Sequence, residues 1–157
     1  MKRTAAVLVA AIFALSAPLI VSAMEHGAKH KEMGHGGMHT MGKTIHSEIV
    51  DGVKATFTLI DMKEQMKGME MPAGMKDTHH LMIMFKDNKT GKTLSEGQVK
   101  VKISGPNKSS QIKNLMGMSG GFGSDVTMPV KGKYGIMTKF QLKDGKVRAS
   151  QFWYELK

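Results

Sequence analysis

The sequence of 157 residues contains no cysteine. Without cysteine the chain has no disulfide framework, so its core must hold together without covalent cross-links. The chain also lacks thiolates, which compete for soft metals and oxidise in their presence, and it has no cysteine nucleophile. Any affinity for a soft metal must therefore come from other side chains.

Aromatic residues are also scarce, at 6% of the chain, and they do not interleave with arginine. This is not the pattern of a nucleic-acid-binding surface, so we expect no nucleic-acid partner. The formal net charge is nevertheless +10. The lysines are spread through turns and alternate strand positions, which predicts a solvated basic surface that favours anionic membranes or acidic partners.

Catalytic patterns are missing as well. Asp61, Glu64, Glu70 and Asp77 flank a methionine-rich segment without a spacing that singles out an acid and a base. The serines have no histidine partner pattern. The glycine-rich segment 120–123 lacks the Lys-Ser/Thr pair of a phosphate loop. We therefore expect a binding protein and no enzyme.

The only long apolar run lies at the N-terminus, where Lys2 and Arg3 precede it and Val21-Ser22-Ala23 forms a small-residue cleavage site. Residues 1–23 are predicted to be a signal peptide, cleaved after Ala23, that exports the chain to the periplasm. An uncleaved membrane anchor is the alternative, because the apolar run is nearly long enough to span a bilayer.

Residues 24–44 are rich in glycine, histidine, lysine and methionine without apolar periodicity, which predicts a disordered tail. Its candidate metal ligands are His26, His30, Met33, His35, Met38, His39 and Met41. Cleavage after Ala23 would also leave an amino group, two amides and His26 as a square-planar set for Cu(II) or Ni(II). A solvated spacer with incidental metal affinity is the alternative.

Residues 45–157 show the period-two alternation of half-buried strands. Strands are predicted at 45–50, 53–60, 78–86, 98–104, 110–116, 126–130, 133–142 and 146–156. This spacing predicts an all-β fold, an antiparallel immunoglobulin-like β-sandwich of about seven or eight strands. The glycine-rich segment 116–123 is expected to be a loop, and Pro129 makes 126–130 a short edge strand. Trp153 is expected in the core.

Sixteen methionines and seven histidines stand out, with the densest run between Met62 and Met75. Thioether sulfur suits Cu(I), and imidazole suits copper broadly. Gly68, Pro72 and Gly74 argue against a strand through 61–77, although a helical turn can precede Gly68. Within this loop the predicted ligands are Met66, Met69, Met71 and Met75. They predict a Cu(I) or Ag(I) site, with a partner-binding lip as the alternative.

The strand at 78–86 follows this loop directly. Its period of two places His79, Leu81, Ile83 and Phe85 on one face and His80, Met82 and Met84 on the other. The metal-ligand candidates in this strand are His79, His80, Met82 and Met84. For Met82 and Met84, packing beneath the loop is the alternative. Weaker candidates are Met116, Met118, Met128 and Met137.

The structured part resembles YtkA-like or FixH-like exported β-sandwich domains. The resemblance rests on the strand 79–85, the turn 87–91, the segment 99–105 and the closing hairpin of 133–142 and 146–156. It implies an immunoglobulin-like fold and a role in copper handling or in the assembly of copper-containing oxidases. The tail is similar in composition to disordered silver- and copper-binding periplasmic proteins.

His80-Leu81-Met82 is also similar to the His-x-Met element of PCuAC-type periplasmic copper chaperones, although Thr58 stands where their spacing calls for a methionine. The sequence thus predicts a periplasmic protein that binds Cu(I) or Ag(I) and buffers copper or delivers it to a membrane or periplasmic recipient. The alternatives are a metal-independent interaction or oxidase-assembly module, and Zn(II) or Ni(II) storage by the tail.

Overall fold

The computed structural model describes residues 42–70 and 72–157. The predicted signal peptide, the tail ligands from His26 to Met41, and Met71 lie outside the described residues. The first strand begins at Lys43, two residues before the predicted start of the β-domain.

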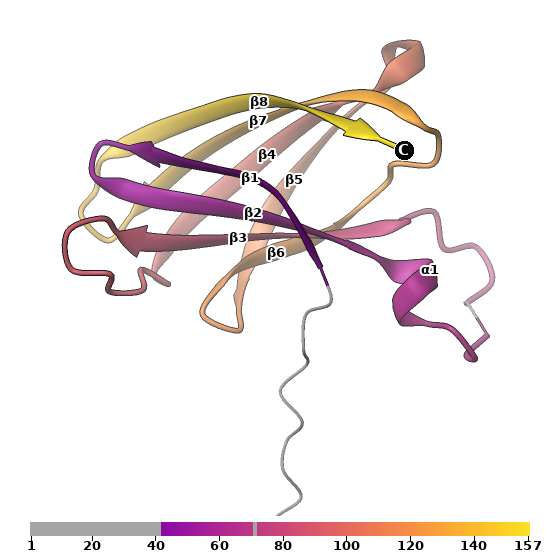
Figure 1. Ribbon diagram of the computed structural model, residues 1–157, viewed down its shortest axis with the longest axis horizontal. Helices are drawn as coiled ribbons and strands as arrows, with labels where there is room; N and C mark the ends of the chain where they lie inside the picture. The colour runs from indigo at the N-terminus through magenta and orange to yellow at the C-terminus, as the bar shows by residue number, and fades with distance from the viewer. Residues whose placement is uncertain (1–41, 71) are drawn as a thin grey trace, which may run out of the picture. The chain divides into compact units, whose positions relative to one another are not determined.

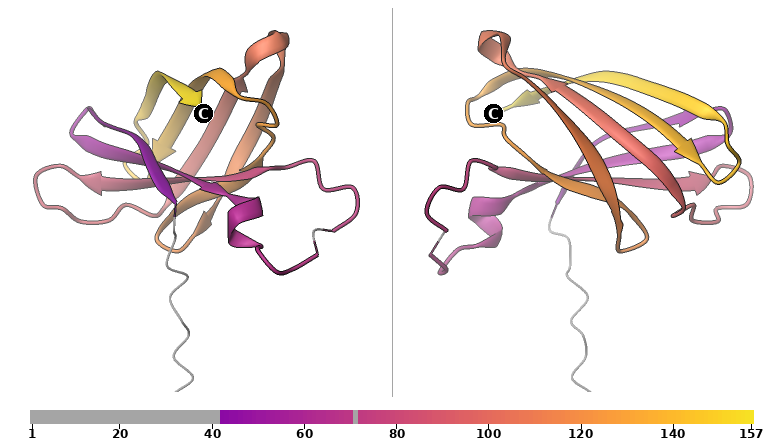
Figure 2. Two further views of the ribbon diagram at one scale, coloured as in Figure 1. Left: turned by 45° about the vertical axis from the view of Figure 1, so that its right-hand side comes forward. Right: turned by 180° about the vertical axis from the view of Figure 1, so that it is seen from behind.

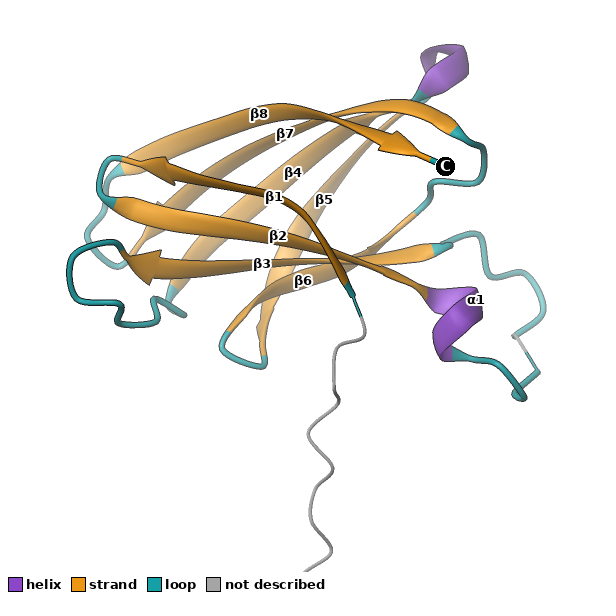
Figure 3. Ribbon diagram, viewed as in Figure 1, coloured by secondary structure: helices purple, strands orange, loops and turns teal. Residues whose placement is uncertain are grey.

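The described chain is almost entirely antiparallel β-structure, which confirms the predicted fold class (Figures 1 and 3). Its strands are β1 (Lys43–Val50), β2 (Val53–Asp61), β3 (His79–Asp87), β4 (Gly97–Ser104), β5 (Ser110–Met118), β6 (Gly121–Val126), β7 (Gly132–Leu142) and β8 (Val147–Leu156). The helices described are α1 (Met62–Gln65) and the 3-10 turn η1 (Pro106–Lys108). Neither has the length and apolar character needed to cross a bilayer.

The strands form one sheet in the order β1-β2-β3-β6-β5-β4-β7-β8, which folds over on itself into two layers (Figures 1 and 2). Strand β5 belongs to both layers, because its residues 110–115 pair with β4 and its residues 116–118 pair with β6. The edge strands β1 and β8 meet through side chains. Glu48 accepts a hydrogen bond from Ser150, and His46 stacks on Phe152 with ring centroids 4.0 Å apart.

The core lies between the two layers and follows the predicted alternation. Strand β2 buries Val53, Ala55, Phe57 and Leu59. Phe85 of β3 stacks on Phe140 of β7 across the layers, with centroids 4.5 Å apart. Each valine, leucine or phenylalanine side chain in this core contributes about 1.5–3 kcal/mol when fully buried, so a cysteine-free core of this kind can hold the fold.

Three expectations about this part of the chain are wrong. The segment expected to be a loop contains β6, which lies in the middle of the sheet between β3 and β5, and residues 127–131 form no strand. Glycine has low strand propensity, but Phe122 and Val126 pack into the core and override it. Trp153 is 60% exposed, because the alternation along β8 turns Phe152 inward and Trp153 outward.

The hairpin between β7 and β8 contains a paired ion. The guanidinium of Arg148, whose residue is 5% exposed, donates to both carboxylate oxygens of Asp144 at 3.0 and 2.6 Å. These hydrogen bonds lower the pKa of Asp144 to about 2. The carboxylate is therefore ionised in the folded state throughout the range in which the protein is expected to work.

Replacing Asp144 by Asn leaves the buried guanidinium without a charged partner, so we expect the variant to be less stable near neutral pH. The folded pKa lies below the ordinary value of 3.8, so this stabilisation is complete above pH 3.8 and is lost as the pH falls toward about 2. The difference between the two proteins in free energy of unfolding should shrink over that window. Urea unfolding at several pH values measures it, and a constant difference would contradict the ion pair's role.

Candidate metal centre

A cavity of about 350 Å³ lies on the outward face of the layer that contains β2, β3 and β6, under helix α1. It is lined by Thr58, Ile60, Met62, Gln65, His80, Met82, Met84, Met118, Ser119 and Asp125. Four thioethers and one imidazole therefore converge there, from α1, β3 and the end of β5.

Strand β3 supplies three of these donors because it alternates as predicted. Leu81 and Ile83 point into the core and are fully buried, which turns His80, Met82 and Met84 to the outward face. Antiparallel pairing then sets their neighbours. Met82 lies opposite Thr58 of β2 and Gly123 of β6, and His80 lies opposite Ile60 and Asp125.

Helix α1 covers the cavity. Asp61 begins it by accepting hydrogen bonds from the amides of Lys63 and Glu64, at 2.8 and 3.3 Å. The amide of Met62 donates to the carbonyl oxygen of Thr78 at 3.1 Å, which ties together the two ends of the methionine-rich connection. Beneath this cover Met82 is 8% exposed although it lies outside the main core.

The glycines of β6 make room for the donors. A Cβ atom on Gly123 would stand 2.7 Å from Nε2 of His80 and 2.8 Å from Sδ of Met118. Both donor atoms therefore lie close to the same backbone position, and the distance between them is less than twice 2.8 Å. A Cβ on Gly121 would stand 3.2 Å from Cγ of Met84. Larger residues in β6 would fill the space in which imidazole and thioether meet.

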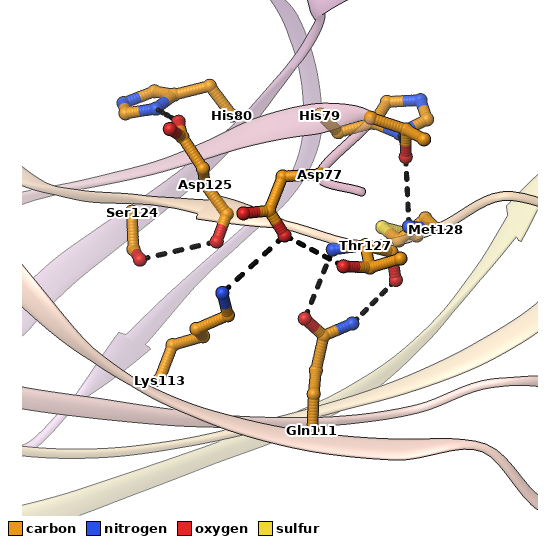
Figure 4. A network of polar contacts seen from close by, with 10 residues as sticks. Asp77, His79, His80, Gln111, Lys113, Ser124, Asp125, Thr127 and Met128 are labelled. Atoms are coloured by element: carbon orange, nitrogen blue, oxygen red, sulfur yellow. Dashed lines mark hydrogen bonds and ion pairs between the residues drawn. The ribbon is translucent and has the colours of Figure 1, made fainter. Parts of the chain in front are cut away.

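Asp125 sets the orientation of His80. Its Oδ1 lies 2.6 Å from Nδ1 of His80 (Figure 4). An ionised carboxylate only accepts hydrogen bonds, so Nδ1 must carry the proton. In the neutral ring, Nε2 then holds a free lone pair on the side where Met118 lies. A metal-binding histidine commonly donates its other N–H to a carboxylate, a carbonyl or water, because this partner fixes the tautomer and the orientation of the ring.

The donor set is soft. Among residues 42–70 and 72–157 no group of three histidine, aspartate or glutamate side chains is placed to hold a metal. Thioethers favour Cu(I) over hard divalent ions, and a single imidazole is compatible with that choice. The cavity's chemistry therefore suits a soft monovalent ion.

The structure separates the two adjacent histidines. His80 lines the cavity, whereas His79 points to the opposite face, is buried, and has Nδ1 2.8 Å from the hydroxyl oxygen of Thr78. Burial lowers the pKa of His79, because desolvation disfavours the charged ring. Of the four candidates predicted in β3, the structure brings His80, Met82 and Met84 together and leaves His79 apart.

The predicted loop methionines that the structure describes, Met66, Met69 and Met75, lie outside the cavity lining. Met66 is half-buried just after α1, Met69 is 72% exposed and Met75 is 37% exposed. In their place the cavity contains Met62 and Met118. Met118 was a weaker candidate because its loop was thought to lack a strand, and recognising that β5 reaches residue 118 would have placed it on the outward face.

A polar network holds the far end of the connection (Figure 4). Asp77 accepts from the hydroxyl of Thr127 at 2.7 Å and pairs with Lys113 at 3.5 Å. The amide of Met128 donates to the hydroxyl oxygen of Thr78 at 2.9 Å. The ends of the methionine-rich connection are thus fixed to β5 and to the segment after β6, and the exposed methionines lie between fixed ends.

No family model and no curated protein matches the chain in sequence. Solved structures that share its fold include two bacterial proteins. One is a copper-bound variant of FetP from uropathogenic Escherichia coli, with 13% identity over 73% of this chain and 89% of that chain and a TM-score of 0.52. The other is the copper-reconstituted P19 protein from Campylobacter jejuni, with 12% identity over 73% and 94% and a TM-score of 0.56. The resemblance to YtkA-like and FixH-like domains stays a prediction.

Removing the carboxylate behind His80 should change its tautomer. In the wild type at a pH where the ring is neutral, we expect the proton on Nδ1. In Asp125→Ala the ring loses its acceptor and should shift toward the Nε2–H form, which free imidazole prefers. Nitrogen-15 to proton correlation spectra distinguish the two forms. Ser124→Ala, next in the chain, is the control and should leave the wild-type tautomer, and an Nε2–H ring in the wild type would refute the assignment.

Proposed function

We propose that this protein binds a soft monovalent metal ion, Cu(I) in the first place with Ag(I) as its mimic, in the cavity under α1. The proposed donors are the thioethers of Met62, Met82, Met84 and Met118 and Nε2 of His80. The observation that carries the proposal is the meeting of His80 Nε2 and Met118 Sδ above Gly123. One ion needs only some of these five donors, and three or four of them would bind it.

Two further observations support this proposal. Nε2 of His80 is kept free of its proton by the hydrogen bond from Nδ1 to Asp125, which prepares it to donate to a metal. Two solved structures of proteins with this fold are described as copper-bound or copper-reconstituted. We extend that property to this chain because its own cavity holds donors that copper prefers.

The remaining parts of the proposal concern the role of the bound ion. The protein is an exported, periplasmic buffer or carrier of copper and performs no catalysis. Met66, Met69 and Met75 serve as entry ligands, because they lie on the connection that leads from solvent to α1. The tail predicted at 24–44, with its ligands from His26 to Met41, captures ions before they reach the fold, including Cu(II). A membrane or periplasmic copper protein receives the ion.

Removing cavity sulfur should weaken Cu(I) binding without unfolding the protein. For Met82→Leu/Met118→Leu we expect affinity to fall by at least roughly 100-fold, because two donors are lost. The change of each methionine to leucine nearly conserves volume and should cost less than about 1.5 kcal/mol in free energy of unfolding. Anaerobic competition against a chromophoric Cu(I) chelator measures the affinity.

The matched control is Met128→Leu/Met137→Leu, which also changes one buried and one partly exposed methionine, both away from the cavity. It should keep the wild-type affinity. Equal affinity in all three proteins would refute a cavity site. If Met66→Leu/Met69→Leu/Met75→Leu instead lost the affinity, the ion would be bound by the loop. Absence of Cu(I) binding in the wild type would favour the interaction module with a methionine-rich lip.

Binding in the cavity should persist in acid. Four of the five proposed donors are neutral sulfurs that carry no proton at any working pH, so only the imidazole competes with protons. We expect Cu(I) to stay bound at pH 5, where a site made of histidines alone loses its metal. Competition titrations at pH 7 and pH 5 test this, with Zn(II) as the comparison ion. Loss of Cu(I) in step with Zn(II) would assign metal binding to the histidines.

A further inference from the structure

The outward face of β4, β5, β7 and β8 is basic and has a different character from the cavity. Its basic side chains are Lys100, Lys102, Lys133 and Lys139. Among the outward positions of these four strands the one acid is Glu155. Within the described part of the chain none of the four lysines forms an ion pair. We call this surface, with Ile112, Met137 and Trp153, the docking face.

The strand register places like charges side by side. Lys100 of β4 lies directly opposite Lys139 of β7. Two like charges in such a pair destabilise a sheet. With Asn114 as the neighbour of Lys100 on β5, no acid offsets them there. A pair of lysines that destabilises the sheet and forms no ion pair within the described part of the chain is suited to bind an anion from another molecule.

The surface beside these two lysines is hollowed. A depression of about 660 Å³ contains Lys100 and Lys139, with Gln98, Asn114 and Gln141 as further polar groups. Its volume falls in the range of sites that hold small molecules. The basic pair and the amides can thus receive an anionic head group, with cations and hydrogen-bond donors on several sides of it.

Apolar side chains stand among the lysines. Trp153 is 60% exposed, and its ring lies against β7 where Gly135 has no side chain. The ammonium of Lys133 lies 5.0 Å from the centre of the ring. Lys102 lies between Met137 and Ile112 in the register. An indole beside lysines is the combination that anchors proteins at a membrane–water interface.

This arrangement differs from that of a protein-binding surface. The centre of a protein–protein interface gathers apolar side chains and is depleted of lysine. On the docking face, lysines instead separate the apolar side chains. An anionic bilayer suits it better, because each lysine gains from the negative surface potential while the indole enters the head-group region.

We propose that the docking face binds the surface of bilayers that contain anionic phospholipid. Strands β4, β7 and β8 belong to one layer of the sandwich, and β2, β3 and β6 belong to the other (Figures 1 and 2). The docking face is on the first layer, and the metal cavity lies on the outward side of the second. Docking therefore leaves the cavity open to the aqueous side. The contact depends on surface charge and does not depend on the bound metal.

The chain has one tryptophan, so its fluorescence reports on Trp153 alone. The predicted mature chain, from Met24, is titrated with vesicles of equal parts phosphatidylcholine and phosphatidylglycerol, and separately with pure phosphatidylcholine. We expect a blue shift of the emission and co-sedimentation with the mixed vesicles, and neither effect with pure phosphatidylcholine. Added salt should weaken the binding, since the attraction is screened.

The decisive variants reverse the charge of two cross-strand lysine pairs. Lys100→Glu/Lys139→Glu changes the pair on the docking face, and Lys54→Glu/Lys86→Glu changes the matching exposed pair on the other layer. The first should reduce the vesicle partition coefficient by roughly 30-fold or more. The second should reduce it much less. The milder Lys100→Gln/Lys139→Gln tests the same point if the reversal impairs folding.

Three results would overturn the proposal. Equal losses of vesicle binding in the two charge-reversed variants would mean that binding depends on the net charge of the protein and not on this face. Absence of binding to the mixed vesicles would exclude the membrane. Binding to polyglutamate as tight as to mixed vesicles, without a shift of the Trp153 emission in either case, would assign the face to an acidic protein.

Discussion

The alternation of β3 between core and outward face is the constraint on which the rest depends. Leu81 and Ile83 are fully buried, so the strand cannot shift its register by one residue without exposing them. That same requirement fixes His80 and Met82 on the outward side. The core therefore positions the donors, and the free energy that holds the sandwich together also keeps the cavity preorganised. Pairing of β3 with β6 completes the arrangement, since Gly123 supplies the space and Asp125 orients the imidazole.

Sulfur without cysteine gives such a site a distinct chemistry. Thioethers bind soft ions without releasing a proton, and they form no disulfides. Because the chain has no cysteine, it also has no thiol that could cross-link it with another chain. The cover of the cavity is the short helix α1, held by its cap at Asp61 and by one backbone hydrogen bond to Thr78. Few contacts hold this cover, and elements of that kind open more easily than core strands. The lysine-rich docking face lies on the other layer, so the two proposed activities use separate surfaces.

The sequence was sufficient for the parts of the fold where alternation is clean. It predicted the strands around Phe57, Ile83 and Phe140, and it placed His80 with Met82 on one face. It failed at β6, because Gly121 and Gly123 look like loop residues until their neighbours across the sheet are known. The sequence did not place Met62 and Met118 beside the methionines of β3 for a related reason, since they come together only through strand pairing and through the turn of the chain at Asp61. Trp153 was placed in the core by residue type, although its position in β8 decides its direction.

The pairing of β3 with β6 also determines when the cavity is completed during folding. His80 and Asp125 are 45 positions apart, and Met118 comes from a strand that follows two further turns. Contacts between residues so distant in sequence form slowly, because a long loop must close before they gain anything. A growing chain that ends before β6 can form the β1–β2 hairpin yet has no oriented imidazole. The cavity is thus complete only after β6 has been inserted between β3 and β5, and a chain that ends before β6 lacks the proposed metal site.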